Sequence, residues 1–327
     1  DTFFLFSIFF GGGTPSVAPV WFISAVIEMI QKSFHSKRRN IEITMEANPE
    51  HITEKVVKEL HKAGINRISL GVQSLSEKDL EYLERNAGAQ KTREAIQILS
   101  AGPVENISAD VIYAIPGQTT RGIENTLNVL LESNISHISA YSLTVAHDTV
   151  LNKMIEAGKR KKPSSAREYH SYKFIRDFLK ENGYIQYEVS NYCLPGKKSG
   201  HNSLYWKYRP FAGLGPSAHS FVAPNRYYNK SEVEIYLEKK PQQYRVSEES
   251  AVWPELFIGT MRLCQPQGNS LFKQSLSRNE WKTFEKLQKD FADKGWMHIL
   301  KNGFEITEQG ILHSDTMLEQ CANAVSF

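Results

Sequence analysis

A run of three glycines follows an apolar stretch near the start of the sequence, in SIFFGGGTPS at residues 7–16. Consecutive glycines allow a bound molecule to meet backbone N–H and C=O groups directly, since no side chain intervenes. The spacing differs from a phosphate-binding loop, because GxGxxG is absent and no GKS or GKT follows. A glycine run is also typical of a simple turn. Gly12, Gly13 and Thr14 are therefore candidates for contact with a ligand, with a turn as the alternative.

Three polar side chains stand near the ends of apolar runs or inside them, and Arg85 follows in a helical pattern. Glu46 lies at the end of IEITMEA, Gln73 follows RISLGV, and Asp110 interrupts ADVIYAI. Glu46 could equally cap the next turn, Gln73 could bond loop backbone, and Arg85 could be an exposed helix residue. Asp110 resists such a reading, because a carboxylate in an apolar strand needs a donor or a cation. Carboxylates suit an ammonium group or two ribose hydroxyls, so the set favours a zwitterionic, ribose-bearing ligand.

The elements that must position these residues alternate between strand and helix. Apolar and alternating patterns predict strands at residues 3–10, 41–47, 67–72, 107–114, 135–143 and 184–189, with helical periodicity between them. Six such units in series predict a parallel sheet with right-handed crossovers, in a full or partial barrel or a doubly wound sheet. Ligands bind at the carboxyl ends of such strands, so the candidate residues are expected to share one mouth.

Two helix starts are also predicted from the sequence. Thr53 is expected to cap the helix after the second strand, because its hydroxyl can accept a backbone N–H of the first turn. Ser76 and Asp79 have the spacing of a capping box, which predicts that a further helix begins there.

Beyond the alternating region the sequence changes character twice. We expect a barrel domain over residues 1–190, a loop-rich aromatic segment over 191–246, and a mainly helical domain over 247–327. The last part reads as helix, two short strands and helix, the outline of a winged-helix-like unit. Its net charge is near zero, which favours a packing or partner surface over a DNA-binding one.

Composition restricts the class of protein. The 327 residues carry 39 basic and 36 acidic side chains, and a net charge of +3 gives no argument for nucleic acid binding. The apolar opening is too short for a membrane span and lacks the basic flank of a signal peptide. The sequence is compatible with peripheral membrane contact. Cys193, Cys264 and Cys321 show no metal-ligand spacing, so we expect reduced thiols and a cytoplasmic protein.

The motifs FFGGGTPS, EANPE, NRISLGVQS, ADVIYAIPGQT and HISAYSLT, in this order, resemble the radical S-adenosylmethionine (SAM) proteins of the oxygen-independent coproporphyrinogen III oxidase group. QYEVSNYCLPG, HNSLYW and GLGPSAHS are more similar to the HemW heme chaperone branch than to the oxidase proper. The resemblance covers nearly the whole chain and implies a partial (β/α)6-type barrel. It also implies that SAM is a cofactor, with contacts from Gly12, Gly13, Thr14, Glu46, Gln73, Arg85 and Asp110.

The same resemblance implies heme as a ligand that is handed to an acceptor protein of unknown identity. The expected heme site comprises the HNxxYW motif and a second histidine: His201, Asn202, Tyr205, Trp206 and His219. His201 is the first choice as iron ligand and His219 the alternative, and either could be structural. Nearby cations could pair with the propionates: Lys197, Lys198, Lys207 and Arg209. The alternative functions are coproporphyrinogen III oxidation and a protein-interaction scaffold that binds no cofactor.

The sequence departs from the family pattern at three places. The cluster motif CxxxCxxC is expected upstream of the glycines, with the first barrel strand, yet no cysteine precedes Cys193. Three thiolates hold the 4Fe-4S cluster in this family. The printed chain is therefore expected neither to assemble the cluster nor to cleave SAM, and no metal site is predicted. Ala146 stands where glutamate is usual, and Ser217 where glycine is usual.

Overall fold

The computed structural model describes residues 4–34, 41–147, 149–223, 225–238, 246–248 and 252–324. The chain divides into two compact units. The first comprises Asp1–Gln186 with Ser190–His201, and the second comprises Tyr187–Val189 with Asn202–Phe327. The contact boundary near residue 201 lies beyond the one expected at residue 190, because the strand and the helix start that follow residue 190 contact the sheet. The three-part division proposed from the sequence stays a prediction.

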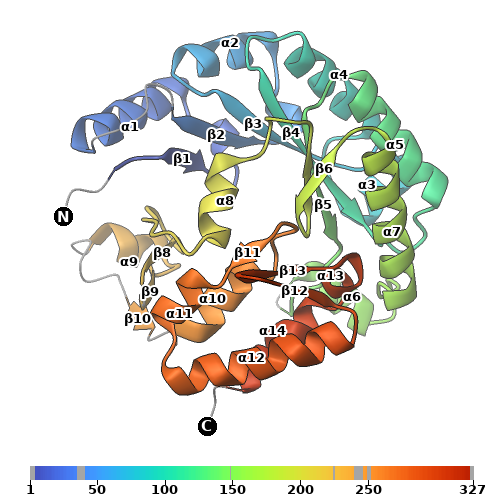
Figure 1. The fold of residues 1–327 in the computed structure, drawn as a ribbon. Helices are drawn as coiled ribbons and strands as arrows, with labels where there is room; N and C mark the ends of the chain where they lie inside the picture. Colours follow the sequence, from blue (N-terminus) through green and yellow to red (C-terminus); the bar gives the residue numbers. More distant parts are fainter. Residues whose placement is uncertain are drawn as a thin grey trace. The chain divides into compact units, whose positions relative to one another are not determined.

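A curled seven-stranded sheet forms the centre of the first unit (Figure 1). Its spatial order is β1-β2-β3-β4-β5-β7-β6. The strands are β1 (Ser7–Phe10), β2 (Glu42–Ala47), β3 (Arg67–Gln73), β4 (Asn106–Tyr113), β5 (His137–Ser142), β6 (Ile185–Glu188) and β7 (Asn191–Cys193). The partial barrel expected from the sequence is confirmed, although Phe3 of the first expected strand lies outside the described residues.

One feature of the predicted sheet is wrong. Strands β1 to β5 pair in parallel, but β7 pairs antiparallel with β5. The sequence had suggested a wholly parallel sheet closed by a sixth strand at 184–189. Instead, the chain turns after β6 and inserts the short strand β7 between β6 and β5.

Each central strand presents a polar and an apolar face. In β2, Ile43, Met45 and Ala47 are buried and apolar, whereas Thr44 and Glu46 point to the other side. The helices lie along the outside of the curve in Figure 1 and bury their apolar stripes against it. They include α1 (Val20–Ser33), α2 (Glu54–Lys62), α4 (Ala89–Ser100), α5 (Thr120–Glu132) and α7 (Ser165–Glu181). The polar face is consequently the inner, concave one.

The two helix starts had different outcomes. The hydroxyl of Thr53 accepts the N–H of Val56 at 3.2 Å, so this cap is confirmed. Helix α3 (Glu77–Tyr82) does begin after Ser76, but Ser76 makes no side-chain capping bond. Asp79 is instead buried and accepts hydrogen bonds from Ser74 at 2.8 Å and Gln118 at 3.1 Å. The predicted capping box is therefore wrong, because burial draws the carboxylate into the core.

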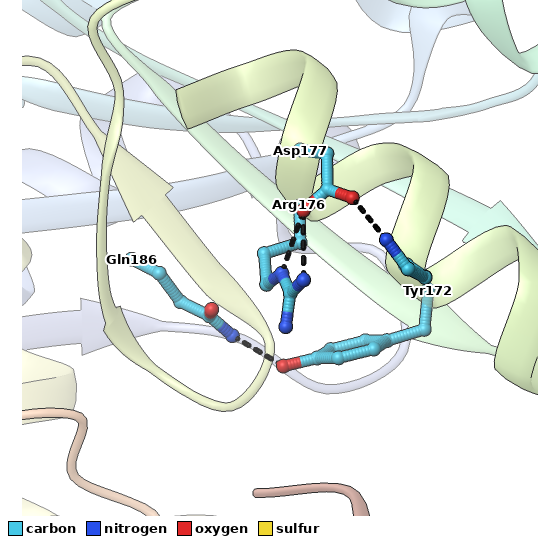
Figure 2. Close-up of polar contacts among 5 residues, drawn as sticks. Tyr172, Arg176, Asp177 and Gln186 are labelled. Atoms are coloured by element: carbon cyan, nitrogen blue, oxygen red, sulfur yellow. Dashed lines mark hydrogen bonds and ion pairs between the residues drawn. The ribbon is translucent and has the colours of Figure 1, made fainter. Parts of the chain in front are cut away.

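A hydrogen bond links the long helix α7 to strand β6 at the sheet edge, and two ion pairs lie on the helix itself (Figure 2). Gln186 of β6 donates from Nε2 to the hydroxyl of Tyr172 at 2.9 Å. On the same helix, Asp177 accepts from Lys173 at 2.8 Å and from Arg176 at 2.8 Å. The bond from Lys173 is the main cause of the lowered pKa of Asp177. Both ion pairs join residues of α7 to one another and are partly exposed, so they add little to its attachment to the sheet.

The second unit contains the winged-helix-like outline that the sequence predicts. Helix α12 (Arg278–Asp293) starts at a capping box between Ser277 and Glu280, and the antiparallel pair β12 (Met297–Leu300) and β13 (Gly303–Ile306) follows. An aromatic cluster forms its core: Phe257, Phe272, Phe284 and Phe304. The further elements are β8 (His219–Val222), β9 (Asn225–Tyr228), α9 (Val233–Glu238), β10 (Val246–Glu248), α10 (Val252–Thr260), β11 (Gln267–Gly268), α11 (Ser270–Ser275), α13 (Glu308–Leu312) and α14 (Ser314–Asn323).

Candidate functional site at the strand ends

The glycine run follows β1 and passes beside the end of β2. The N–H of Gly12 donates to Oε2 of Glu46 at 3.2 Å. A Cβ on Gly11 would lie 2.6 Å from the ring of Phe9, so this position cannot carry a side chain without a shift. Gly12 has a φ of +99°, and a Cβ on Gly12 or Gly13 would meet nothing within 4 Å. The backbone here is therefore bare toward open space, as a ligand cradle requires.

A second group of polar side chains closes over Gly71 in β3. The guanidinium of Arg85 donates to Oδ1 of Asn48 at 3.0 Å. A Cβ on Gly71 would lie 3.0 Å from Nε2 of Gln73 and 3.3 Å from Nη2 of Arg85. Gln73 reaches this position through an irregularity in the strand, with a φ of +62°. The structure thus brings Gln73 and Arg85 together, and it adds Asn48.

Asp110 lies on the inner face of β4, between Gly71 of β3 and Ser139 of β5. Its oxygens accept from Ser69 at 3.1 and 3.2 Å. Burial raises the pKa of Asp110, while hydrogen bonds from Ser139 and Ser69 and the charge of Arg67 lower it. The carboxylate is thus solvated by hydroxyls but held by no direct ion pair among the described residues. Such a group favours a cation or hydroxyl donors from a ligand.

Glu46 and Asp110 interact electrostatically. Burial raises the pKa of Glu46, the charge of Asp110 raises it further, and the bond from Gly12 lowers it. Two neighbouring carboxylates that both resist ionisation are stabilised when a positive group lies between them. The ammonium and sulfonium groups of SAM have that charge, and its ribose supplies hydroxyl donors. The residues at the strand ends therefore fit this cofactor.

His201 lies near the start of helix α8 (Gly200–Trp206) and contacts strand β1. Its Nδ1 is 2.8 Å from the hydroxyl of Ser7, and its ring stacks on Phe9 with 4.8 Å between centroids. Glu42 accepts from the N–H groups of Gly200 and His201 at 2.9 and 2.8 Å. Burial lowers the pKa of His201 to about 4, partly opposed by the charge of Glu42. The imidazole is consequently neutral at neutral pH.

The other expected heme residues belong to the second unit. The ring of Trp206 lies under the guanidinium of Arg262, 4.9 Å from its centroid, and Arg262 pairs with the buried Glu188 at 3.3 Å. Tyr205 is exposed and packs edge-on against Phe211. Trp206 thus contacts the core of the second unit, whereas His201 contacts the sheet of the first.

Asn202 and His219 complete the expected set. Asn202 lies in α8 and is half-buried. His219 is exposed at the start of β8, where its ring lies 6.0 Å from that of Tyr228. No single cluster of the described contacts unites His201 with His219, so the heme assignments stay predictions.

The cysteines do not fit an iron-sulfur cluster. Cys193 and Cys321 are buried, Cys264 is half-buried, and none of the three forms a disulfide in the described part of the chain. Burial raises the pKa of Cys321 to about 12, the opposite of a thiolate ligand. Within the described ranges, no group of three or more His, Cys, Asp or Glu side chains could hold a metal ion. No helix of the described part of the chain is long and apolar enough to cross a bilayer.

Sequence reasoning missed several residues of this site. Asn48, Ser69 and Ser139 make its hydrogen bonds, but short polar residues in strands and turns are common and attract no notice alone. The signal that could have found them is the period of two. Ser69 lies two residues from Arg67 and two from Gly71 along β3, so it lies with them on the inner face of the sheet, as Asp110 does in β4. Asn48 lies two residues after Glu46.

A curled half-barrel with a glycine cradle and carboxylates at its strand ends defines a protein of the radical SAM class. The Radical SAM superfamily model matches residues 4–130. The heme chaperone HemW of Lactococcus lactis is 32% identical over 311 residues, which cover 92% of this chain and 82% of the relative. HemW of Bacillus subtilis is 30% identical, covering 94% of this chain and 82% of the relative. The chain belongs to the HemW family of radical SAM proteins.

A solved structure supports the same fold. Coproporphyrinogen III oxidase (HemN) of Escherichia coli superposes with a TM-score of 0.78, covering 96% of this chain and 77% of the oxidase. At 19% identity this likeness concerns the fold. The superfamily implies SAM and an iron-sulfur cluster as cofactors, and the described residues fit the first and not the second.

Proposed function

We propose that this chain binds heme and passes it to an acceptor protein, with SAM bound at the strand ends. The two relatives at about one third identity are named heme chaperones, and this similarity extends over nearly the whole chain. The likeness to the oxidase is one of fold at lower identity, which favours the chaperone over radical decarboxylation. A cytoplasmic location stays part of the proposal.

The observation that carries the heme proposal is the state of His201. A metal-binding imidazole must be neutral, and in known sites its other nitrogen is held by a hydrogen bond that orients the ring. His201 meets both conditions, with a pKa of about 4 and Nδ1 bonded to Ser7. Nε2 of His201 is therefore our first choice as the iron ligand. His219, exposed on β8, is the alternative.

Hemin titration of the purified chain tests this proposal. The parent is expected to develop a Soret band that saturates at one hemin per chain. His201→Ala should weaken binding about tenfold and shift the band, because one iron ligand is lost, and His219→Ala should leave both unchanged. The reverse pattern would move the ligand to His219. Unchanged spectra in both variants would remove these histidines from the heme site, and a parent without a saturable band would contradict heme binding.

A further inference from the structure

Arg67 is a buried cation on the inner face of the sheet, outside the strand-end site. It begins β3, its backbone pairs with Thr44 of β2 and Asn106 of β4, and its exposed fraction is 4%. Among the described residues, its guanidinium makes no hydrogen bond and no ion pair. A buried charge without a partner is destabilising, so its presence calls for an explanation.

The groups around Arg67 do not neutralise it directly. Its charge lowers the pKa of Asp110, of His137 and of Cys193, so it lies near all three side chains. Asp110 is the acidic one, and it is already hydrogen-bonded by Ser69 and Ser139. His137 is neutral, because burial and Arg67 lower its pKa well below the usual value. Cys193 is a neutral thiol, since burial raises its pKa.

Two further observations concern the surroundings of Arg67. Oγ1 of Thr44, the cross-strand neighbour of Arg67, is buried and has no hydrogen-bond partner in the described part of the chain. Lys197 reaches Asn106 at 3.2 Å, and the charge of Lys198 acts on Cys193. These cations therefore gather near the amino ends of the strands, whereas Glu46 and Asp110 lie toward the carboxyl ends.

The acidic side chain nearest to these cations along β2 is Glu42, and it is already engaged. Its carboxylate accepts from Ser199 and from the N–H groups of Gly200 and His201. The carboxylate of Glu42 therefore accepts hydrogen bonds from the start of helix α8 and, among the described residues, forms no ion pair with Arg67. The inner face therefore carries acidic side chains toward the carboxyl ends of its strands and a basic side chain, Arg67, toward the amino ends.

We propose that Arg67, with the hydroxyl of Thr44, forms a subsite for a ligand carboxylate on the inner face of the half-barrel. A guanidinium binds a carboxylate through two parallel hydrogen bonds, and the hydroxyl adds a third donor. Two ligands of the proposed function carry this group. One is a propionate of heme, and the other is the amino-acid end of SAM.

The subsite is tested first without either large ligand, so that it does not depend on the proposed function. Sodium propionate is added to the purified chain, and the unfolding temperature is compared with that in propionamide at equal ionic strength. The parent is expected to gain about 1 °C or more with propionate only, because an anion that binds the folded state stabilises it. Arg67→Met should show no gain, whereas Arg121→Met, at an exposed arginine of α5, should behave as the parent.

A purely structural role for Arg67 predicts a different result. Arg67→Met should then unfold at a lower temperature without ligand, whereas an unpaired cation predicts an equal or higher unfolding temperature. A Met variant that unfolds earlier and still responds to propionate overturns the proposal. If it does not fold, Arg67→Lys replaces it, since loss of the planar fork should still weaken the response. A response equal to that of the parent overturns the proposal as well.

Two pairs of ligands identify the source of the carboxylate. Hemin is compared with its dimethyl ester, and SAM with decarboxylated SAM, each on the parent and on Arg67→Met. For the ligand whose carboxylate occupies the subsite, the form with the carboxylate should bind the parent about tenfold more tightly than the form without it. The two forms should bind Arg67→Met with equal affinity. No difference in either pair, together with no propionate effect, refutes the subsite. A propionate effect without heme or SAM binding refutes the proposed function alone.

Discussion

The carboxylate of Asp110 in β4 raises the pKa of Glu46 in β2, although strand β3 lies between them. Both groups point to the inner face, and burial is the largest cause of the raised pKa in each. The folded chain therefore keeps two carboxylates in a place that disfavours their charge. A positive ligand removes that penalty, which is the physical basis for a cofactor site at this edge.

The pH dependence of stability tests the burial of Asp110. The folded protein binds this proton at higher pH than the unfolded chain does, so the free energy of unfolding falls as pH rises through the folded pKa. The penalty is complete above the folded pKa and absent below the unfolded one, which is about 3.8. Asp110→Asn should consequently be more stable than the parent at pH 8, and the difference should shrink as the pH falls toward the unfolded pKa.

Urea unfolding over a series of pH values from 8 downward measures this difference. Asp177→Asn is the control with the opposite sign, because Lys173 lowers the pKa of Asp177 and its charge stabilises the fold above the unfolded pKa. An Asp110→Asn variant that is less stable than the parent at pH 8 would mean that the charged form is favoured there.

The contacts of Glu42 predict a loss of stability on substitution. Its two oxygens accept from two backbone N–H groups and from Ser199, and these bonds fix the start of α8. Glu42→Gln should lower the free energy of unfolding by about 1 to 2 kcal/mol, since a charged acceptor is replaced by a neutral one. Glu54→Gln removes only an exposed pair with Lys58 and should change little.

Chemical denaturation compares the two glutamine variants with the parent. Equal stability of Glu42→Gln and Glu54→Gln would show that the start of α8 does not depend on this carboxylate.

Ser217 has a φ of +59°, in the left-handed region that favours glycine. The family resemblance indicates a glycine at this position, and the positive φ is a physical reason why glycine is favoured there. Ser217→Gly should raise the free energy of unfolding by about 0.5 to 1 kcal/mol, because the strain removed exceeds the added freedom of the unfolded chain. Thermal unfolding measures the gain, with Ser231→Gly, an exposed serine outside that region, as the control. A gain in both variants, or in neither, would contradict this reason.

The parallel strands were predictable because their signals are local. The runs of β2 to β4 are long, apolar on one face and followed by clear turns, so pattern alone locates them. Strand β7 was not predictable in this way. It has three residues, and its antiparallel pairing with β5 depends on a chain reversal that no residue type marks.

The same contrast holds for the site. Asp110 stood out because a carboxylate interrupts an apolar run, and the glycines stood out because three are adjacent. Arg67 did not, because an arginine at the start of a strand is usually exposed, and its burial is seen only in the folded chain. The contact of His201 with Ser7 joins residues 194 positions apart, which no spacing rule predicts.

The measurement that tests the strand-end site most directly is calorimetric titration of SAM into the parent, Glu46→Gln and Asp110→Asn. Each variant removes one charged partner from a sheltered site, which should weaken binding about tenfold or more. Glu54→Gln, exposed on α2, should bind as the parent does. A clear loss in the first two variants and none in the control is the result that we expect. Equal affinity in all four proteins would contradict the assignment of Glu46 and Asp110 to a SAM site.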